Sequence, residues 1–341
     1  MASRNSLATR NVWRLKHRPE GDIADGDLVY AAEDLPPIAE GQFLLRVIYL
    51  SLDPTNRIWM SDDEQYMPPV EMGAPMRGGI AGEVVESRKP GVAVGDRFLG
   101  LGEWTDLVVT DGTGLSPFPA IPGIDFAHQV GTLGLVGPTA YFGLLDIGQP
   151  KPGETLVVSS AAGGVGQIVG QIGKIMGCRV IGIAGGKAKC DYVVNELGFD
   201  ACIDYKSQDV GTELDRLAPD GVDINFEQVG GHIMAAVLQR MKLFGRVPLC
   251  GLISQYNGHE DDPASIWTMM LMRRITVRGF IVLDFAHRFG EAAQALAGWM
   301  LAGKLKTRQD VRPGLENAAT VVRELYTGGN FGKLLIEVSK P

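Results

Sequence analysis

The stretch Thr155–Cys190 reads TLVVSSAAGGVGQIVGQIGKIMGCRVIGIAGGKAKC, and it decides the fold of the chain. It opens with a short apolar run, residues 155–158, of the length and composition of a strand that is buried on both faces. After a glycine-rich turn, apolar residues recur at the three-to-four spacing of one helix face until Gly177. Residues 179–184 form a second apolar run. The stretch therefore predicts one βαβ unit.

The turn between the first predicted strand and the helix fits a dinucleotide-binding fingerprint that has alanine at its first small position. Its members are Ala161, Gly163, Gly164, Val165 and Gly166. Such a turn lets the backbone approach a pyrophosphate and directs the N–H groups of the helix at it. Because a strand precedes the turn and an amphipathic helix follows it, we interpret it as a nucleotide site. The structural alternative is a tight turn that binds no ligand.

The end of the second predicted strand indicates which dinucleotide is bound. An NAD site normally carries an acidic residue there, which binds the ribose hydroxyls. This chain instead has Gly185 and Gly186, followed by Lys187 and Lys189. Two cations in place of an acid suit the 2′-phosphate of NADP(H), although lysines are also common as solvated residues in a first helical turn. We therefore expect NADP(H) as the cofactor.

Length and composition narrow the class of protein. The chain has 341 residues, which suits two domains, and a net charge of −8, which argues against a nucleic-acid partner. Neither a leader peptide nor a membrane-spanning run is legible, so we expect a cytoplasmic enzyme that does not enter a membrane. The four cysteines show no CxxC spacing, which leaves neither a disulfide framework nor a zinc lobe. Cys190, beside Lys189, has either a lowered thiol pKa or an ordinary packing role.

The rest of the chain divides into two patterns. Up to about residue 126, short β-like runs alternate with Gly, Pro and Asp, which indicates a partly open antiparallel barrel. The polar loop 53–69 is long enough to be functional, and an ordinary surface loop is the alternative. A helical pattern begins at His128, and helices and strands then alternate, which predicts an α/β domain with a doubly wound parallel sheet. The β-like runs of the first part are 42–50, 79–86, 96–100 and 104–110; the later strands are 201–205, 222–226, 245–251, 275–282 and 333–338; and the later helices are 190–197, 210–217, 233–244, 289–302 and 317–325.

Several motifs along the chain resemble one known family. They are LSLDP at 50–54, MRGG at 76–79, TAYFGLL at 139–145, AAGGVG at 161–166, ELGFDACIDYK at 196–206, GLISQYN at 251–257, GKLK at 303–306 and NFGK at 330–333. This combination resembles the zinc-independent medium-chain reductases. Within them it is most similar to the prostaglandin reductase and alkenal/enone double-bond reductase branch, which includes a bacterial curcumin reductase.

The resemblance implies an architecture and an activity. The expected parts are a GroES-like domain over 1–126, a Rossmann domain over 127–302 and a C-terminal return to the first domain over 303–341. Such enzymes are usually dimers, so a homodimer is expected. They transfer a hydride from NADPH to the β-carbon of an α,β-unsaturated aldehyde or ketone and protonate the α-carbon, and the enolate formed between these steps needs a hydrogen-bond donor.

The resemblance also implies site residues. Lys189 and Tyr205 are expected at the 2′-phosphate, Tyr256 near the nicotinamide and Asn330 on the cofactor. Tyr256 is our candidate for orienting the nicotinamide ribose and for stabilising or protonating the enolate. The alternative is that it only packs on the cofactor while water supplies the proton.

Two departures from the family pattern affect the site. Relatives often have DNVGG where this chain has EQVGG at 227–231, so that Gln228 must make a cofactor contact usually made by asparagine, or the contact is lost. Many relatives have a tyrosine after LDP, where this chain has Thr55-Asn56-Arg57 as an altered wall of the substrate pocket. Tyr66 is a second candidate for that pocket, although it could simply brace its loop.

Other classes of protein are weighed against this resemblance. Zinc alcohol dehydrogenases need cysteine and histidine ligands, and no cysteine precedes Cys178, so no metal is expected. The acidic stretch 259–262 is better explained as a solvated loop. An NADPH quinone reductase of the same superfamily is the nearest enzyme alternative, and a non-catalytic NADPH-binding or structural protein is the alternative from another class.

Overall fold

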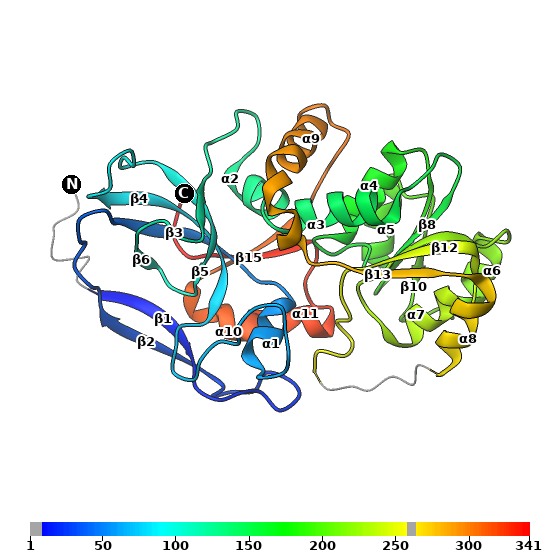
Figure 1. Cartoon of the computed structure of the whole chain (residues 1–341), viewed down its shortest axis with the longest axis horizontal. Helices are drawn as coiled ribbons and strands as arrows, with labels where there is room; N and C mark the ends of the chain where they lie inside the picture. Colours follow the sequence, from blue (N-terminus) through cyan, green and yellow to red (C-terminus); the bar gives the residue numbers. More distant parts are fainter. Residues whose placement is uncertain (1–8, 258–263) are drawn as a thin grey trace. The chain divides into compact units, whose positions relative to one another are not determined.

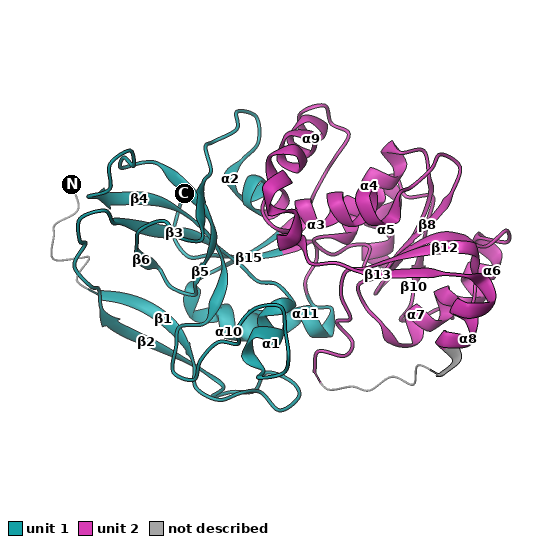
Figure 2. Cartoon of the chain, in the orientation of Figure 1, with its two compact units in different colours: residues 1–130, 310–329, 334–341 teal, residues 131–309, 330–333 magenta. Residues whose placement is uncertain are grey.

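The computed structural model describes residues 9–257 and 264–341, so the acidic stretch 259–262 lies outside the described residues. The chain forms two compact units (Figure 2). Unit 1 contains the described residues through Val130 together with 310–329 and 334–341. Unit 2 contains 131–309 and 330–333. The chain therefore leaves the first unit, forms the second and returns.

Unit 2 is built on a six-stranded sheet of order β10-β9-β8-β11-β12-β13, in which each neighbouring pair is parallel. Its strands are β8 (Thr155–Val158), β9 (Arg179–Ala184), β10 (Ala201–Asp204), β11 (Val222–Phe226), β12 (Met241–Leu249) and β13 (Thr276–Gly279). The direction of winding reverses between β8 and β11. In such sheets ligands bind beyond the carboxyl ends of the strands at this switch point. The predicted doubly wound sheet is confirmed.

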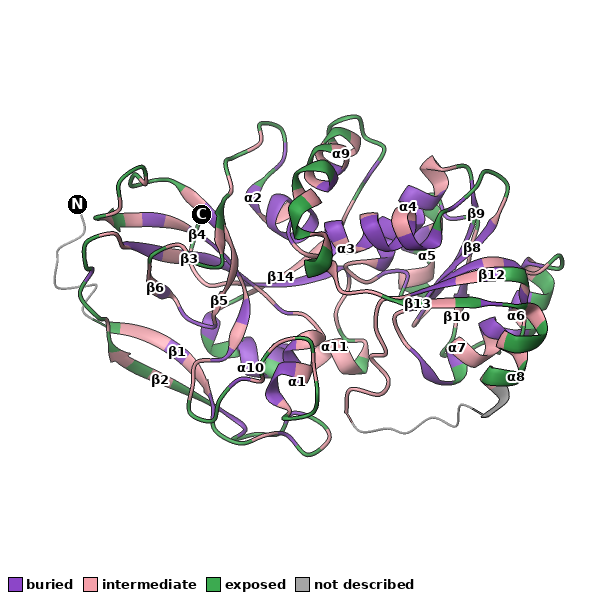
Figure 3. Ribbon diagram, in the orientation of Figure 1, coloured by how far each residue is buried: buried purple, intermediate pink, exposed green. Residues whose placement is uncertain are grey.

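Helices cover both faces of this sheet. Figure 1 shows α4 (Gly166–Ile175) and α5 (Lys187–Asn195) on one face, and α7 (Gly231–Leu238) and α8 (Ala264–Arg273) on the other. The unit also contains α3 (Val136–Phe142), η3 (Gly143–Gly148), α6 (Val210–Leu217), η4 (Val282–Arg288) and α9 (Phe289–Leu301), whereas α2 (Phe126–His128) belongs to unit 1 and η2 (Gln129–Leu133) crosses the boundary at Val130. Strands β8 and β9 are purple in Figure 3 because almost every residue in them is buried. Continuous apolar runs form these strands because helices pack on both of their faces.

Two helices differ from their predicted bounds. The helix predicted over 233–244 ends at Leu238, and β12 begins at Met241. No Gly or Pro lies between Gly231 and Gly245 to mark the change, and apolar residues continue across it, so the sequence pattern conceals the boundary. The helix predicted over 317–325 is broken into η5 (Leu315–Asn317), α10 (Ala318–Val321) and α11 (Glu324–Thr327).

Unit 1 is an antiparallel β domain, as predicted. Its seven-stranded sheet has the order β14-β15-β3-β4-β5-β7, with β6 paired to β3, and a separate ribbon joins β1 to β2. These strands are β1 (Thr9–Leu15), β2 (Leu28–Asp34), β3 (Phe43–Ser51), β4 (Arg77–Ser87), β5 (Arg97–Glu103), β6 (Leu107–Thr110), β7 (Leu115–Pro117), β14 (Gln309–Pro313) and β15 (Lys333–Glu337). Phe43, Trp104 and Leu334 belong to one buried core, so the returning C-terminal strand completes the packing of this domain. The loop 53–69 carries a short helix, α1 (Thr55–Met60).

No single helix among the described residues is both long and apolar enough to cross a membrane. Only the bent pair 126–133 and 136–148 passes that test of length and composition when taken together.

Candidate functional site

The glycine-rich turn lies directly after β8, at the switch point of the parallel sheet. Ser160 has a positive φ of 50°, and its carbonyl oxygen accepts the N–H of Gly163 at 2.9 Å. A Cβ atom on Gly166 would lie 2.3 Å from that same oxygen, so a larger residue cannot take this position without moving the turn. The turn therefore brings bare backbone to the start of α4. This is the geometry that accommodates a pyrophosphate.

A second segment, residues 330–333, lies against this turn. The N–H of Gly332 donates to the carbonyl oxygen of Ala162 at 3.0 Å, and a Cβ atom on Gly164 would lie 3.0 Å from the side chain of Lys333. Within the segment, Asn330 Nδ2 donates to the carbonyl oxygen of Gly332 at 3.0 Å. The structure thus brings the predicted cofactor residue Asn330 to the predicted pyrophosphate turn.

An aromatic and amide cluster holds segment 330–333 in place. Phe331 lies between the guanidinium of Arg308, at 4.1 Å, and the ring of Tyr192, whose centroid is 5.1 Å away in an edge-on contact. The Tyr192 hydroxyl donates to Oε1 of the fully buried Gln167 at 3.0 Å, and this oxygen also accepts the N–H of Arg308 at 2.8 Å. Burial raises the pKa of Tyr192 to about 12. The neutral phenol is therefore a structural donor.

Sequence reasoning missed this cluster. The signal that could have found it is a pair of glutamines four residues apart, Gln167 and Gln171, within the glycine- and isoleucine-rich helix α4. Both are buried, and Gln171 exchanges two hydrogen bonds with the backbone of Lys306, at 2.7 and 2.9 Å. A buried amide needs partners, and here they are backbone groups of a distant segment.

The end of β9 carries the residues predicted for the 2′-phosphate. A Cβ atom on Gly185 would lie 3.0 Å from the hydroxyl of Tyr205 and 3.0 Å from Cε of Lys206, so these three residues lie together. The carboxylate of Asp204 accepts the N–H of Gly186 at 2.7 Å, and this bond holds the pKa of Asp204 below its usual range. The acid nearest this corner is thus bound to backbone.

The two lysines after Gly186 differ in their surroundings. Lys187 forms an exposed ion pair with Asp191 at 2.6 Å, four residues along α5. Lys189 is the third residue of α5, and its backbone N–H donates to the carbonyl oxygen of Gly186 at 3.1 Å. Lys206, whose Cε lies beside Gly185, is a further cation at this corner that sequence reasoning did not single out, and the role of Lys189 at a phosphate stays a prediction.

A buried carboxylate shapes the turn after β11. Glu227 is fully buried, and its Oε1 accepts the Ser159 hydroxyl at 3.0 Å and the backbone N–H groups of residues 228, 229 and 230 at 3.0, 2.7 and 2.9 Å. Its Oε2 accepts Asn225 Nδ2 at 2.9 Å. The predicted cofactor residue Gln228 donates from Nε2 to the carbonyl oxygen of Ser159 at 2.7 Å. Gln228 is therefore bound to Ser159, which lies between β8 and the glycine-rich turn.

Tyr256 lies on a loop that is tied to the same turn. Ile253 N–H donates to the carbonyl oxygen of Gln228 at 3.2 Å. The Tyr256 hydroxyl oxygen accepts the N–H of Leu252 at 3.1 Å, and a Cβ atom on Gly251 would lie 2.9 Å from that oxygen. The loop thus holds the phenol against the backbone of residues 251 and 252, and the catalytic role of Tyr256 stays a prediction.

The predicted substrate-pocket residues all lie in unit 1. Thr55 Oγ1 and the Tyr66 hydroxyl are 2.5 Å apart, so they form one polar pair. Asn56 and Arg57 are buried, and both bind backbone: Asn56 Oδ1 accepts the N–H of Asp53 at 2.7 Å, and Arg57 donates to the carbonyl oxygens of residues 19 and 21 at 2.9 and 3.0 Å. The contacts of Asn56 and Arg57 are those of residues that hold the loop. Their role in a pocket stays a prediction.

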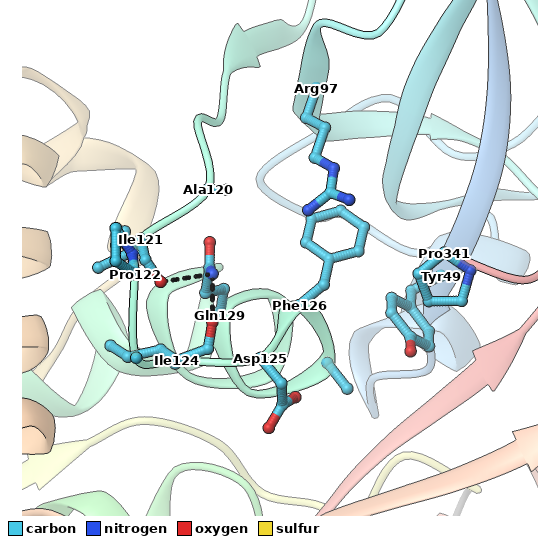
Figure 4. Close-up of a pocket in the computed structure, with 12 residues that line it drawn as sticks. Tyr49, Arg97, Ala120, Ile121, Pro122, Ile124, Asp125, Phe126, Gln129 and Pro341 are labelled. Carbon is cyan, nitrogen blue, oxygen red and sulfur yellow. Dashed lines mark hydrogen bonds between the residues drawn. The ribbon is translucent and has the colours of Figure 1, made fainter.

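Unit 1 also contains a cavity of about 500 Å³ (Figure 4). Arg97 lies over the ring of Phe126 at 4.4 Å on one side of it, and Gln129 Nε2 donates to the carbonyl oxygen of Ile124 at 2.6 Å on the other. Tyr49, Pro341 and the other residues of the segment 120–127 also line it. The predicted pocket residues 55–57 and Tyr66 are not among the residues that line this cavity.

In the described part of the chain, no group of three or more His, Cys, Asp or Glu side chains is placed to hold a metal ion.

Two parts of the chain match known protein families. Residues 164–298 match the family described as "Zinc-binding dehydrogenase". Residues 11–118 match the "N-terminal domain of oxidoreductase" family. The chain is 42% identical over 336 residues to the NADPH-dependent curcumin reductase of Escherichia coli, an alignment that covers 96% of each chain. The chain belongs to the zinc-independent medium-chain reductases.

Other reductases of the curcumin, alkenal and prostaglandin reductase branch are similar over most of their length. The NADP-dependent 2-alkenal reductase of Nicotiana tabacum is 37% identical, over 89% of each chain. The crystal structure of CurA from Vibrio vulnificus in complex with NADPH is 41% identical, covers 97% of this chain and 100% of that one, and superposes with a TM-score of 0.92. The E. coli quinone oxidoreductase complexed with NADPH shares only the fold, at 21% identity and a TM-score of 0.76.

Proposed function

We propose that this reductase uses NADPH to reduce the carbon–carbon double bond of α,β-unsaturated aldehydes and ketones. The observation that carries the proposal is the 42% identity, over 96% of each chain, to an NADPH-dependent curcumin reductase. The 2-alkenal reductase and the prostaglandin reductases among the relatives support the same reaction class. Glycines that a Cβ atom would obstruct, at the turn after β8 and at the end of β9, fit a dinucleotide bound at the switch point.

Each part of the site has a task in this reaction. The turn 161–166 holds the pyrophosphate, and segment 330–333, including Asn330, covers that turn. Lys189, Tyr205 and Lys206 bind the 2′-phosphate, because lysines and a phenol supply charged and neutral donors to phosphate oxygens. Bound NADPH supplies the hydride for the β-carbon.

Glu227 and Tyr256 act on the nicotinamide side. Glu227 fixes the backbone of residues 228–230, and this places Gln228 and, through Ile253, the loop that carries Tyr256. The Tyr256 hydroxyl donates a hydrogen bond toward the enolate oxygen and holds a proton for the α-carbon. A donor aimed at developing oxyanion charge is worth about 3 kcal/mol in the transition state. Thr55 and Tyr66 form the polar wall of the substrate pocket.

The test is NADPH oxidation by the purified protein with a 2-alkenal, an aromatic enone, a saturated aldehyde and a quinone, with products identified by mass and NMR. We expect saturated carbonyl products from the first two substrates and none from the saturated aldehyde. Turnover of the quinone alone would assign the chain to quinone reduction. Tight NADPH binding with no turnover would assign it to the non-catalytic NADPH-binding proteins.

We also propose that the reductase is a cytoplasmic homodimer. Within the described residues, β13 ends its sheet and pairs only with β12, and large apolar side chains are exposed on β12, at Leu243 and Phe244, and on the helix α8 that precedes β13, at Trp267, Leu271 and Met272. A second copy that continues the sheet would satisfy the open edge and could cover these side chains. Four unpaired cysteines suit a reducing compartment. Light scattering should give twice the chain mass, and Trp267→Glu should give a monomer, whereas a monomeric wild type would contradict the proposal.

A further inference from the structure

Cys190 and Cys202 form a thiol pair at the corner of unit 2 where β9 meets α5. Cys190 is the fourth residue of α5, Cys202 is the second residue of β10, and their sulfur atoms are 2.8 Å apart, with the Cys202 thiol donating to Cys190. Neither residue is fully buried, and both are free cysteines. A disulfide bond is roughly 2.05 Å long, so the two sulfurs need to approach by less than about 1 Å to be bonded.

The environment makes one sulfur of the pair the nucleophile. The hydrogen bond from Cys202 lowers the pKa of the Cys190 thiol, and the same contact raises the pKa of Cys202. Cys190 also lies in the first turn of α5, where the helix dipole favours a thiolate. The thiolate is the reactive form of cysteine.

The other two cysteines, Cys178 and Cys250, differ from Cys190 in the direction of their pKa shift. Burial raises the pKa of Cys178 to about 11 and that of Cys250 to about 12. They stay protonated at neutral pH, so they serve as internal controls for any reaction of the pair.

The pair also adjoins the proposed 2′-phosphate site. Cys190 follows Lys189 directly, and Cys202 is three residues before Tyr205. The N–H of Gly186 donates to Asp204 at 2.7 Å, so the residue before α5 is already bound to the end of β10. A covalent bond between the two sulfurs would move the first turn of α5, with Lys189, toward β10.

We propose that Cys190 and Cys202 are a reversible redox site: a hydroperoxide converts the dithiol to a disulfide, and this disulfide weakens the binding of NADPH. The effect on NADPH rests on the proposed function, because it acts through Lys189 and Tyr205 at the 2′-phosphate. Hydroperoxides are the named oxidant because they are a common two-electron oxidant of thiolates.

The chemistry balances in two steps. The Cys190 thiolate attacks one peroxide oxygen, the O–O bond breaks, and the alkoxide or hydroxide that leaves takes up a proton; Cys190 becomes a sulfenic acid. The Cys202 thiol then attacks that sulfur, the S–O bond breaks, and the Cys202 proton leaves with the hydroxyl as water. Two thiols and one hydroperoxide give one disulfide, one alcohol and one water, with the two electrons of the thiols reducing the peroxide. A small dithiol reductant reverses the bond by exchange.

The test uses the full chain, reduced and then treated with a small excess of hydrogen peroxide. After alkylation and digestion without reductant, mass spectrometry should find the peptides of Cys190 and Cys202 linked, and the thiol count should fall from four to two. Dithiothreitol should restore all four thiols. A linked pair that includes Cys178 or Cys250, or no linked peptide at all, would overturn the redox site.

The second part of the test measures cofactor affinity by the fluorescence of bound NADPH and NADH. The disulfide form should bind NADPH roughly five-fold or more weakly, because phosphate contacts depend on the position of the lysine, while NADH affinity should change less than about two-fold. Cys202→Ser should keep its NADPH affinity under peroxide, and Cys250→Ser should respond like the wild type. An equal loss for both cofactors, or unchanged NADPH affinity in a protein shown to be disulfide-bonded, would overturn the regulatory role. If the reduced protein binds NADPH and NADH equally, the 2′-phosphate site of the proposed function fails, while the linked peptide still decides the redox site.

Discussion

The backbone N–H of Gly332 donates to the carbonyl oxygen of Ala162 at 3.0 Å. This bond joins the glycine-rich turn to a segment that lies 170 residues later in the chain, and it places Asn330 beside the turn. Phe331 anchors the segment between Arg308 and Tyr192, and Gln167 binds both of these residues. The proposed cofactor site is therefore built from two distant pieces of sequence.

Lys189→Ala should weaken NADPH binding by roughly ten-fold or more and leave NADH binding nearly unchanged, because a charge-assisted bond to a phosphate contributes about 1.5–3 kcal/mol. The matched control is Lys187→Ala, since Lys187 is engaged by Asp191 on the surface. Dissociation constants for both cofactors measure the effect. An equal loss for NADPH and NADH would remove the argument for a 2′-phosphate site.

Gly166→Ala should abolish measurable NADPH binding. The added Cβ atom would lie 2.3 Å from the carbonyl oxygen of Ser160, so the turn must open to accept it. Gly298→Ala in α9 is the control, because a Cβ atom there meets nothing within 4 Å. Calorimetric titration would reveal the difference, and a Gly166→Ala protein that binds NADPH normally would exclude the turn as the pyrophosphate site.

Glu227→Gln should lower the free energy of unfolding by about 2–3 kcal/mol. The glutamine keeps the size of the side chain, but its amide nitrogen cannot accept, so at least one buried N–H or hydroxyl group loses its partner. Asp215→Asn is the control, since Asp215 lies at the surface in an ion pair with Arg240, and it should change stability by less than about 1 kcal/mol. Denaturant titrations compare the variants. Equal stability of Glu227→Gln and wild type would show that the carboxylate does not hold the turn.

Tyr256→Phe should reduce kcat by roughly ten- to a hundred-fold with the enone substrates while the dissociation constant of NADPH stays within about two-fold. Tyr141→Phe is a suitable control, because the Tyr141 hydroxyl bonds a partly exposed carboxylate, that of Glu291, at 3.1 Å. Steady-state rates distinguish a tyrosine that stabilises or protonates the enolate from one that has only a packing role. An unchanged kcat would favour a tyrosine that only packs on the cofactor, with water as the proton source.

The sequence predicted those parts of the fold that depend on local pattern. The βαβ unit 155–184 appears within a residue of its predicted bounds, because buried strands and an amphipathic helix leave strong periodic signals. The ribbon β1–β2 and the helix α1 were not predicted. The two strands of the ribbon pair with each other across the irregular segment 16–27, which is too long for a short hairpin turn, and α1 lies inside a polar loop.

The site was predictable to the extent that single motifs define it. The turn 161–166 follows from one short motif, and the structure forms a tight turn there. The corner where Gly185 meets Tyr205 follows from two others, and the structure places these two residues together. Gln167 and Lys206 were missed because they meet groups far along the chain, the N–H of Arg308 and the backbone at Gly185, and Glu227 was missed because its main partners are backbone N–H groups of the turn that follows it. No sequence pattern shows which backbone groups a buried polar side chain will meet.

The most direct test of the proposed reaction is the reduction of an aromatic enone with NADPH that carries deuterium on the transferring face of carbon 4. The account predicts a saturated ketone with one deuterium on the β-carbon and a solvent-derived hydrogen on the α-carbon. Deuterium on the carbonyl carbon, in an allylic alcohol, would contradict it, as would oxidation of NADPH by a quinone with no deuterated ketone formed from the enone.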